Sequence, residues 1–441
     1  MTRQEERFQL DNGLEVRRGW HYGYVVLLFG MLNLAGSLGL GRFAYTMILP
    51  AMRDGLGFHN TQMGLIGTIG FIGYLAMTIP GGMLAARFGP RLVITLALLV
   101  CGLGMLLMGS VSSLNGSIVL MIIVGIGSAA GNAAGFSFAS AWFAGRSRGK
   151  ATGIIFGGAG FGMVTVGLLI PFILAHGGAA GWRWAWYVSG TLTVLFGILC
   201  GFFLRNSPAD MGLRPIGEED RESEAGIPQP GASTAIPLAW RRVYTSRELW
   251  RVSFIILTFG FAYIIYGTFF AAYVQDEVGL SKAEAGALWS LVGFLAIFSG
   301  LIGGTLSDRL GGSWAFTCLL LAQILALLLV ALSQRHAFLY ASIALFGLSV
   351  WGFPALLGVT CADVLGPRLA PAGVGFAIFF FAIGQAAGPI TAGALHDRTG
   401  SFAMPFLTGA AALLLGLIAT WARFGGSLHG PGSLDGTAQG S

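Results

Sequence analysis

Long apolar stretches separated by short polar segments run along most of the chain. A helix needs about 20 mostly apolar residues to cross the hydrocarbon core of a bilayer, and these stretches have that length. The pattern therefore predicts an all-α integral membrane protein with twelve transmembrane helices. We expect the helices at residues 20–50, 61–85, 92–110, 117–142, 150–175, 184–205, 251–275, 282–306, 314–333, 338–365, 371–395 and 403–423.

One polar stretch, 206–250, is longer than the other connections and divides the predicted helices into two sets of six. It contains GEEDRESEAGIPQPGAS, whose charged, Pro, Gly and Ser residues are typical of a solvated linker. The predicted organisation is a polar N-terminal tail (1–19), a first six-helix half (20–205), a cytoplasmic linker (206–250), a second six-helix half (251–423) and a C-terminal tail (424–441).

The composition agrees with this pattern. Of the 441 residues, 55% are hydrophobic and 10% are charged, whereas a typical soluble domain carries about 25% charged residues. The four cysteines fall in apolar stretches and form no CxxC pair, so we expect neither a disulfide framework nor a metal site. The formal net charge of +6 does not indicate nucleic-acid binding, because the basic residues follow loop position. We expect no cofactor.

The basic residues also predict the topology, because cytoplasmic loops of membrane proteins are enriched in Lys and Arg. If both termini lie in the cytoplasm, 19 of the 25 Lys and Arg residues fall in cytoplasmic segments and five fall in outer loops. The remaining one is Arg42, which lies inside the first predicted helix. We therefore expect a multi-pass protein with both termini in the cytoplasm.

A nine-residue segment occurs twice at corresponding places. GGMLAARFG, 81–89, follows the second predicted helix and GGTLSDRLG, 303–311, follows the eighth; five of the nine positions match. The repeat predicts two pseudo-symmetric halves.

These features resemble the major facilitator superfamily, which carries a Gly-x-Leu-x-Asp-Arg-x-Gly loop after its second helix and echoes it after its eighth. The second copy here retains Asp308, whereas the first has Ala86 in place of the acid. The resemblance implies a monomeric secondary transporter in the lipid bilayer of a bacterial inner membrane, working by alternating access. It also implies a gating loop formed by Gly82, Arg87, Gly89, Gly304, Asp308, Arg309 and Gly311.

Arg42, in GLGRFAYTMILP (39–50), is the most informative polar residue. An arginine at membrane depth costs at least ~2.5–3.5 kcal/mol, so something must offset its charge. All 19 acidic residues fall in tails, linker, loops or helix ends, which leaves no obvious counter-ion in mid-helix. Two interpretations remain open: Arg42 binds an anionic substrate, or it pairs with main-chain carbonyl groups and joins two helices. The missing acid favours the substrate.

The same segment is similar to the first helix of the anion:cation symporters, in which an Asp-Arg pair precedes a short stretch ending in Pro and the arginine binds the organic anion. Arg42 matches that arginine, Gly41 replaces the acid, and Tyr74 matches a tyrosine of the second helix. The resemblance implies a small organic anion as substrate, with a carboxylate expected, and no proton coupling through that acid.

Several other polar residues are candidates to line the site. On a regular helix Tyr45 shares the face of Arg42, because residues three and four apart are neighbours; the others lie in helices that line the cavity of the resembled superfamily. For each of these residues taken singly, hydrogen bonding or packing between helices is the alternative role. The substrate-binding candidates are Arg42, Tyr45, Tyr74, Asn132, Tyr263, Tyr266, Trp351 and Gln385.

Other classes of function fit less well. An exporter of drugs or metabolites is favoured by a mid-helix acid, and a facilitator-like sensor by a signalling domain; the sequence shows neither. Enzymatic chemistry is not expected, because there is no HExxH motif and GRSRGKAT, 145–152, lacks the spacing of a phosphate-binding loop. Glycines four apart, in the pairs Gly153/Gly157, Gly158/Gly162 and Gly384/Gly388, predict close helix packing.

Overall fold

The structure is a computed structural model that describes residues 21–143, 145–216, 244–365 and 369–422. Within these ranges, twelve helical segments are long and apolar enough to cross a membrane. The predicted all-helical fold with twelve spans is therefore confirmed. The predicted tails, 1–19 and 424–441, and most of the linker, 217–243, lie outside the described residues.

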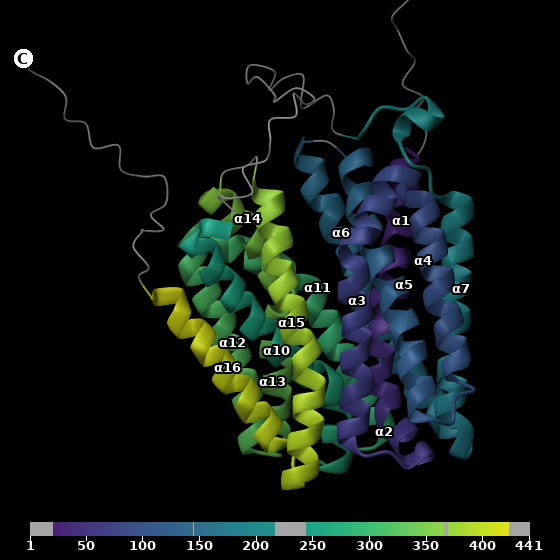
Figure 1. Cartoon of the computed structure of the whole chain (residues 1–441), viewed down its shortest axis with the longest axis vertical. Coiled ribbons are helices and arrows are strands. Elements are labelled where there is room, and N and C mark those ends of the chain that lie inside the picture. Colours follow the sequence, from purple (N-terminus) through teal and green to yellow (C-terminus); the bar gives the residue numbers. More distant parts are fainter. Residues whose placement is uncertain (1–20, 144, 217–243, 366–368, 423–441) are drawn as a thin grey trace, which may run out of the picture.

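The first six spans form the N-terminal group of helices (Figure 1). The first span has three parts, because a π-helical segment interrupts the α-helix in its middle. The parts are α1 (Gly23–Leu34), η1 (Ala35–Phe43) and α2 (Ala44–Leu56). The other spans of the group are α3 (Asn60–Phe88), α4 (Pro90–Met108), α5 (Leu114–Trp142), α6 (Gly145–His176) and α7 (Gly181–Phe203), with short 3-10 turns η2 (Gly178–Ala180) and η3 (Pro208–Met211).

The last six spans form the C-terminal group. One of them is interrupted at Val350 and Trp351, where the main-chain nitrogen of Trp351 donates a hydrogen bond to Ser299 Oγ at 3.0 Å. The helices of this group are α10 (Arg247–Asp276), α11 (Lys282–Leu310), α12 (Gly312–Leu332), α13 (His336–Ser349) and α14 (Gly352–Leu365), which share one span, α15 (Ala370–Thr399) and α16 (Ala403–Trp421).

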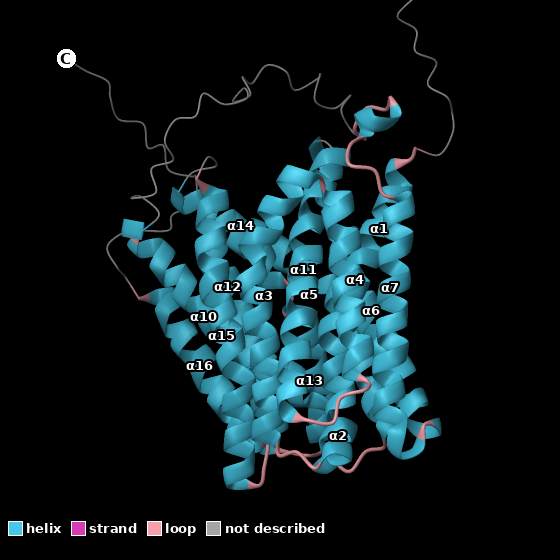
Figure 2. Cartoon of the chain, turned by 45° about the vertical axis from the view of Figure 1, so that its right-hand side comes forward, coloured by secondary structure: helices cyan, strands magenta, loops and turns pink. Residues whose placement is uncertain are grey.

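The helices run along the long axis of the molecule and give it two ends, the upper and lower ends in Figure 1 (see also Figure 2). The linker end holds the start of α1 and residues 204–216, and the distal end holds the connections 57–59, 277–281 and 400–402.

The two groups touch mainly along two helix pairs, α3 with α15 and α6 with α11. Thr68 Oγ1 of α3 donates a hydrogen bond to the Ala386 carbonyl of α15 at 2.6 Å. Ser290 Oγ of α11 donates to the Val164 carbonyl of α6 at 3.1 Å. These side-chain bonds to main-chain carbonyls fix the register of the two groups without placing a charge in the apolar interior.

The distal end carries charged contacts between the groups. Arg53 of α2 and Asp276 of α10 form a two-pronged ion pair, Nη1–Oδ2 at 2.6 Å and Nη2–Oδ1 at 3.3 Å. Asp397 of α15 accepts hydrogen bonds from the main-chain nitrogens of Asn60 at 3.2 Å and Thr61 at 2.7 Å. Asp397 therefore caps the first turn of α3 from the other group, where a carboxylate is favoured by the helix dipole.

Close helix packing occurs at one of the predicted glycine pairs of α6. A Cβ atom on Gly162 would lie 2.5 Å from Gly39 Cα, and one on Gly158 would lie 2.1 Å from the Met31 carbonyl oxygen. These glycines let the first span approach α6 directly. Gly153, by contrast, makes no such contact among the described residues, because no atom beyond its own helix backbone lies within 4 Å of the place that a Cβ would take.

Candidate functional site

The π-helical segment η1 positions Arg42 near the centre of the bundle. A π-helix has a wider turn than an α-helix, and short π segments occur often at functional sites. Three glycines lie in this segment, and Gly39 is held against Gly162 of α6. The segment is therefore tightly packed on the α6 side. Arg42, one residue before its end, is only half-buried.

The guanidinium of Arg42 has one hydrogen bond and an aromatic environment. Its Nη2 donates to Tyr263 Oη at 2.7 Å, whereas its Nε is buried and has no hydrogen-bond partner in the described part of the chain. Its Cζ lies 4.5 Å from the ring centroid of Phe71 and 5.1 Å from that of Tyr74. Among the described residues Arg42 belongs to no ion pair, so its charge is met by π faces and one hydroxyl group.

Two amide side chains extend this arrangement into a network. Gln385 Nε2 of α15 donates to Tyr263 Oη, so the tyrosine oxygen accepts from two sides. Asn132 Nδ2 of α5 donates to Tyr74 Oη at 2.5 Å. The structure thus brings five of the predicted residues together at the junction of the two groups of helices: Arg42, Tyr74, Asn132, Tyr263 and Gln385.

Trp351 joins the network through ring contacts. Its ring centroid lies 6.5 Å from that of Tyr263 and 6.2 Å from that of Phe43. Its indole Nε1 is buried and has no hydrogen-bond partner among the residues that the structure describes. Trp351 sits at the break between α13 and α14, where the unwound turn lets its side chain reach toward α10 and η1.

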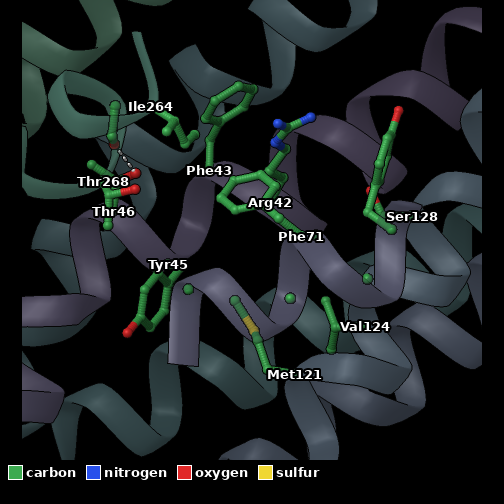
Figure 3. A pocket seen from close by; sticks show the side chains of 16 residues that line it. Arg42, Phe43, Tyr45, Thr46, Phe71, Met121, Val124, Ser128, Ile264 and Thr268 are labelled. Carbon is green, nitrogen blue, oxygen red and sulfur yellow. Dashed lines mark hydrogen bonds between the residues drawn. The ribbon is translucent and has the colours of Figure 1, made fainter. Parts of the chain in front are cut away.

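The hydroxyl groups of Tyr45 and Tyr266 take no part in this network. Tyr45 points away from Arg42 (Figure 3), and its hydroxyl group donates to the Met63 carbonyl at 2.6 Å. The expectation that Tyr45 shares the face of Arg42 assumed a regular α-helix, and the wider turn of η1 removes that alignment. Tyr266 stacks on Phe346 and its hydroxyl group lies 3.2 Å from Ser342 Oγ, inside the C-terminal group.

A cavity adjoins Arg42 (Figure 3). Its walls are largely apolar and come from both groups of helices, with α10 contributing the residues from the C-terminal group. The side chains lining it are Arg42, Phe43, Tyr45, Thr46, Phe71, Tyr74, Met121, Val124, Ser128, Ile264 and Thr268.

This architecture can be compared with known proteins. A family model of the Major Facilitator Superfamily matches residues 31–389, and a second match covers 270–435. The chain belongs to the Major Facilitator Superfamily.

Curated relatives of this facilitator carry the names of anion transporters. It is 27% identical over 394 residues to the "Probable sulfoacetate transporter SauU" of Cupriavidus necator, covering 86% of this chain and 89% of that protein. It is 25% identical over 398 residues to the "Hexuronate transporter" of Bacillus subtilis, covering 87% of this chain and 90% of that protein.

Solved structures agree on the fold. A bacterial homolog of the human lysosomal transporter Spinster, in an inward-facing and unoccupied conformation, superposes with a TM-score of 0.69 at 17% identity, covering 91% of this chain and 95% of that chain. The nucleoside transporter NupG superposes with a TM-score of 0.69 at 12% identity, covering 91% and 98%. At these identities the likeness establishes the facilitator fold alone.

The two copies of the repeated segment lie at equivalent places of the facilitator. The first ends α3 and the second ends α11, both at the linker end, and the helices stop at Gly89 and Gly311. These glycines have φ of 84° and 81°, a conformation that favours glycine. Gly82 and Gly304 face open space, and Asp308 and Arg309 are exposed. Their gating role, like that of Arg87, stays a prediction.

One residue beside the guanidinium, Phe71, escaped the sequence analysis. Phe71 lies directly against the guanidinium, and it is three residues before Tyr74, so helical spacing from that tyrosine was the available signal. Thr46 donates from Oγ1 to the Gly267 carbonyl at 2.5 Å and thereby ties α2 to α10. A threonine in an apolar helix gives no signal that distinguishes this contact from a bond within its own helix.

Proposed function

We propose that this facilitator is a secondary transporter that carries a small organic anion, with a carboxylate as the expected group, across the bacterial inner membrane by alternating access. Arg42 is the anion-binding residue. The protein works as a monomer with both termini in the cytoplasm. Tyr74, Asn132, Tyr263, Trp351 and Gln385 complete the binding site.

The single observation that carries this proposal is the state of the Arg42 guanidinium. It lies between the two groups of helices, beside a cavity, with a buried Nε that has no partner in the described part of the chain. An arginine presents several N–H groups in a planar fork that suits a carboxylate. The names of the sulfoacetate and hexuronate relatives support an acidic substrate.

Uptake into proteoliposomes tests the proposal. The purified protein is given radiolabelled hexuronate, sulfoacetate and short monocarboxylates, with a neutral sugar and an organic cation as controls. We expect uptake of at least one acid and of neither control. A hydrogen bond to a charged group contributes about 1.5–3 kcal/mol, so Arg42→Ala should weaken anion binding roughly 10- to 100-fold. Arg42→Lys should retain part of the activity, because it keeps the charge and loses the fork.

Arg335→Ala is the matched control, because Arg335 is exposed at the start of α13. Size-exclusion profile and thermal unfolding show whether each variant is folded. Equal anion uptake by Arg42→Ala and the parent removes Arg42 from the mechanism, and uptake of the cation but of no acid overturns the anion assignment.

A further inference from the structure

The aromatic rings around Arg42 offset its charge even when the site holds no anion. The guanidinium carbon lies 4.5 Å from the Phe71 ring, 5.1 Å from the Tyr74 ring and 5.9 Å from the Phe43 ring. A cation within about 6 Å of a ring centroid is attracted by the negative π face. The shortest of these contacts is with Phe71, whose side chain has no polar atom and can therefore interact with the guanidinium only through its ring.

The origin of these rings matters as much as their distance. Phe71 and Tyr74 both come from α3, three residues apart and so on one face, and Arg42 comes from the first span of the same group of helices. Tyr263, the one hydrogen-bond partner of the guanidinium in the described part of the chain, belongs to the other group. In transporters of this kind one group rocks against the other around a fixed site. Phe71 and Tyr74 therefore accompany Arg42 through the motion, whereas the bond to Tyr263 must be remade.

The ring of Tyr74 is held in this position by a hydrogen bond to its hydroxyl group. Its hydroxyl oxygen accepts a hydrogen bond from Asn132 Nδ2 of α5 at 2.5 Å, again within the N-terminal group. The ring can therefore keep its face toward the guanidinium whichever way the two groups are tilted.

We propose that the ring of Phe71, supported by that of Tyr74, offsets part of the Arg42 charge when no anion is bound and thereby lets the empty carrier change conformation. The inference rests on the proposed function. Exchange of one anion for another uses only the loaded carrier, in which the anion neutralises Arg42. Net uptake also requires the empty carrier to return. During that return the bond to Tyr263 is broken and the guanidinium passes through an occluded state that excludes water, so the rings of its own group of helices are then the groups that offset its charge. Phe71 acts through Arg42 and is therefore a positioning residue. By easing the return of the empty carrier, it favours net anion uptake over obligate exchange.

The ratio of net uptake to exchange tests this role. Both rates are measured with the same radiolabelled anion in proteoliposomes, the first into empty vesicles and the second into vesicles loaded with the unlabelled anion. We expect Phe71→Leu and Phe71→Met to lower the ratio roughly 3- to 30-fold, in line with the loss of one buried cation–π contact. Phe71→Tyr keeps a ring and should restore the parental ratio.

Phe202→Leu is the matched control, because this side chain of α7 is 68% exposed and remote from the site. If Phe71→Leu and Phe71→Met lower both rates by the same factor, the ring only shapes the binding site and the inference fails while the proposed function stands. A parent protein that exchanges anions and shows no net uptake also overturns it. A parent that moves no anion in either assay overturns the proposed function itself.

Discussion

Tyr263 of α10 connects the two groups of helices, because its hydroxyl group binds the charged guanidinium of Arg42 from the other group. Its oxygen accepts hydrogen bonds from Arg42 and from Gln385, which uses both acceptor positions of a phenol. The hydroxyl hydrogen therefore remains available as a donor. Under the proposed function, a carboxylate bound to Arg42 accepts this hydrogen, and Tyr263 is then a second anion-binding group that comes from the opposite group of helices.

Replacing Tyr263 by Phe tests this role of the hydroxyl group. A hydrogen bond to a charged partner contributes about 1.5–3 kcal/mol, so the variant should bind the anion at least about tenfold more weakly. Tyr266→Phe is a matched control, because Tyr266 lies one turn along α10 and its hydroxyl group lies within hydrogen-bonding distance of Ser342 Oγ. The control should change affinity less than twofold, as measured by titration of the purified proteins. Equal losses in both variants contradict the assignment.

The first span determines the geometry of the site, because the π segment η1 contains Arg42 and changes the direction of its side chain relative to α2. A continuous α-helix through residues 35–43 would present Arg42 and Tyr45 on adjacent positions of one face. The structure instead sends Tyr45 to Met63 and Arg42 to Tyr263. The close contact between Gly39 and Gly162 holds the π segment against α6, so we expect this contact to maintain the register.

Gly162→Ala tests the contact between η1 and α6. The added Cβ would lie 2.5 Å from Gly39 Cα, which is backbone and cannot rotate away. Overpacking of this kind typically costs about 1–3 kcal/mol, so we expect a lower unfolding temperature together with weaker anion binding. Gly153→Ala on the same helix is the control. Among the described residues, no atom beyond its own helix backbone lies within 4 Å of the place that the added Cβ would take. It should be neutral or slightly stabilising. A Gly162→Ala protein as stable as the control would show that η1 can move freely against α6.

The sequence pattern predicts the helices of this protein better than the directions of their side chains. The twelve spans, and the place of Arg42 inside the first of them, followed from hydropathy and charge, which are properties of each segment alone. The position of Tyr45 did not follow, because a π segment changes the side-chain direction and leaves no mark in the pattern of apolar residues. Phe71 was missed for a related reason. An apolar residue in an apolar span gives no sign that its ring faces a cation.

At the scale of the whole molecule, the polar contacts between the two groups, among the described residues, gather at the distal end and in the middle of the bundle. The ion pair of Arg53 with Asp276 and the cap that Asp397 places on α3 both lie at the distal end. Hydrogen bonds between the groups continue to the middle of the bundle, where Thr68 meets Ala386. Under the proposed alternating-access mechanism, the distal end is the closed side in this conformation, and its polar contacts must break before the substrate can enter from there.

Asp397→Asn should weaken this closure. Its two carboxylate oxygens accept two main-chain hydrogen bonds at the start of α3. Asn keeps one acceptor oxygen, turns an NH2 donor toward the other N–H group and removes the negative charge at the helix N-terminus, at a cost of about 0.5–2 kcal/mol. The ratio of distal-open to distal-closed molecules should then rise roughly 2- to 30-fold. Spin labels at His59 and Lys282, in a protein whose native cysteines are replaced, report the distance across the distal end by pulsed electron resonance. We expect Asp397→Asn to add a population at longer distance.

Asp54→Asn provides the contrast at the same end of the molecule. Its carboxylate pairs with Arg53 of its own helix, and its side chain is 68% exposed, so removing it leaves the hydrogen bonds between the groups intact. The distance distribution should therefore match that of the parent. If Asp397→Asn also leaves the distribution unchanged, the cap on α3 does not hold the distal end closed. The ion pair between Arg53 and Asp276 would then have to provide the closure, and Asp276→Asn should produce the longer distance in its place.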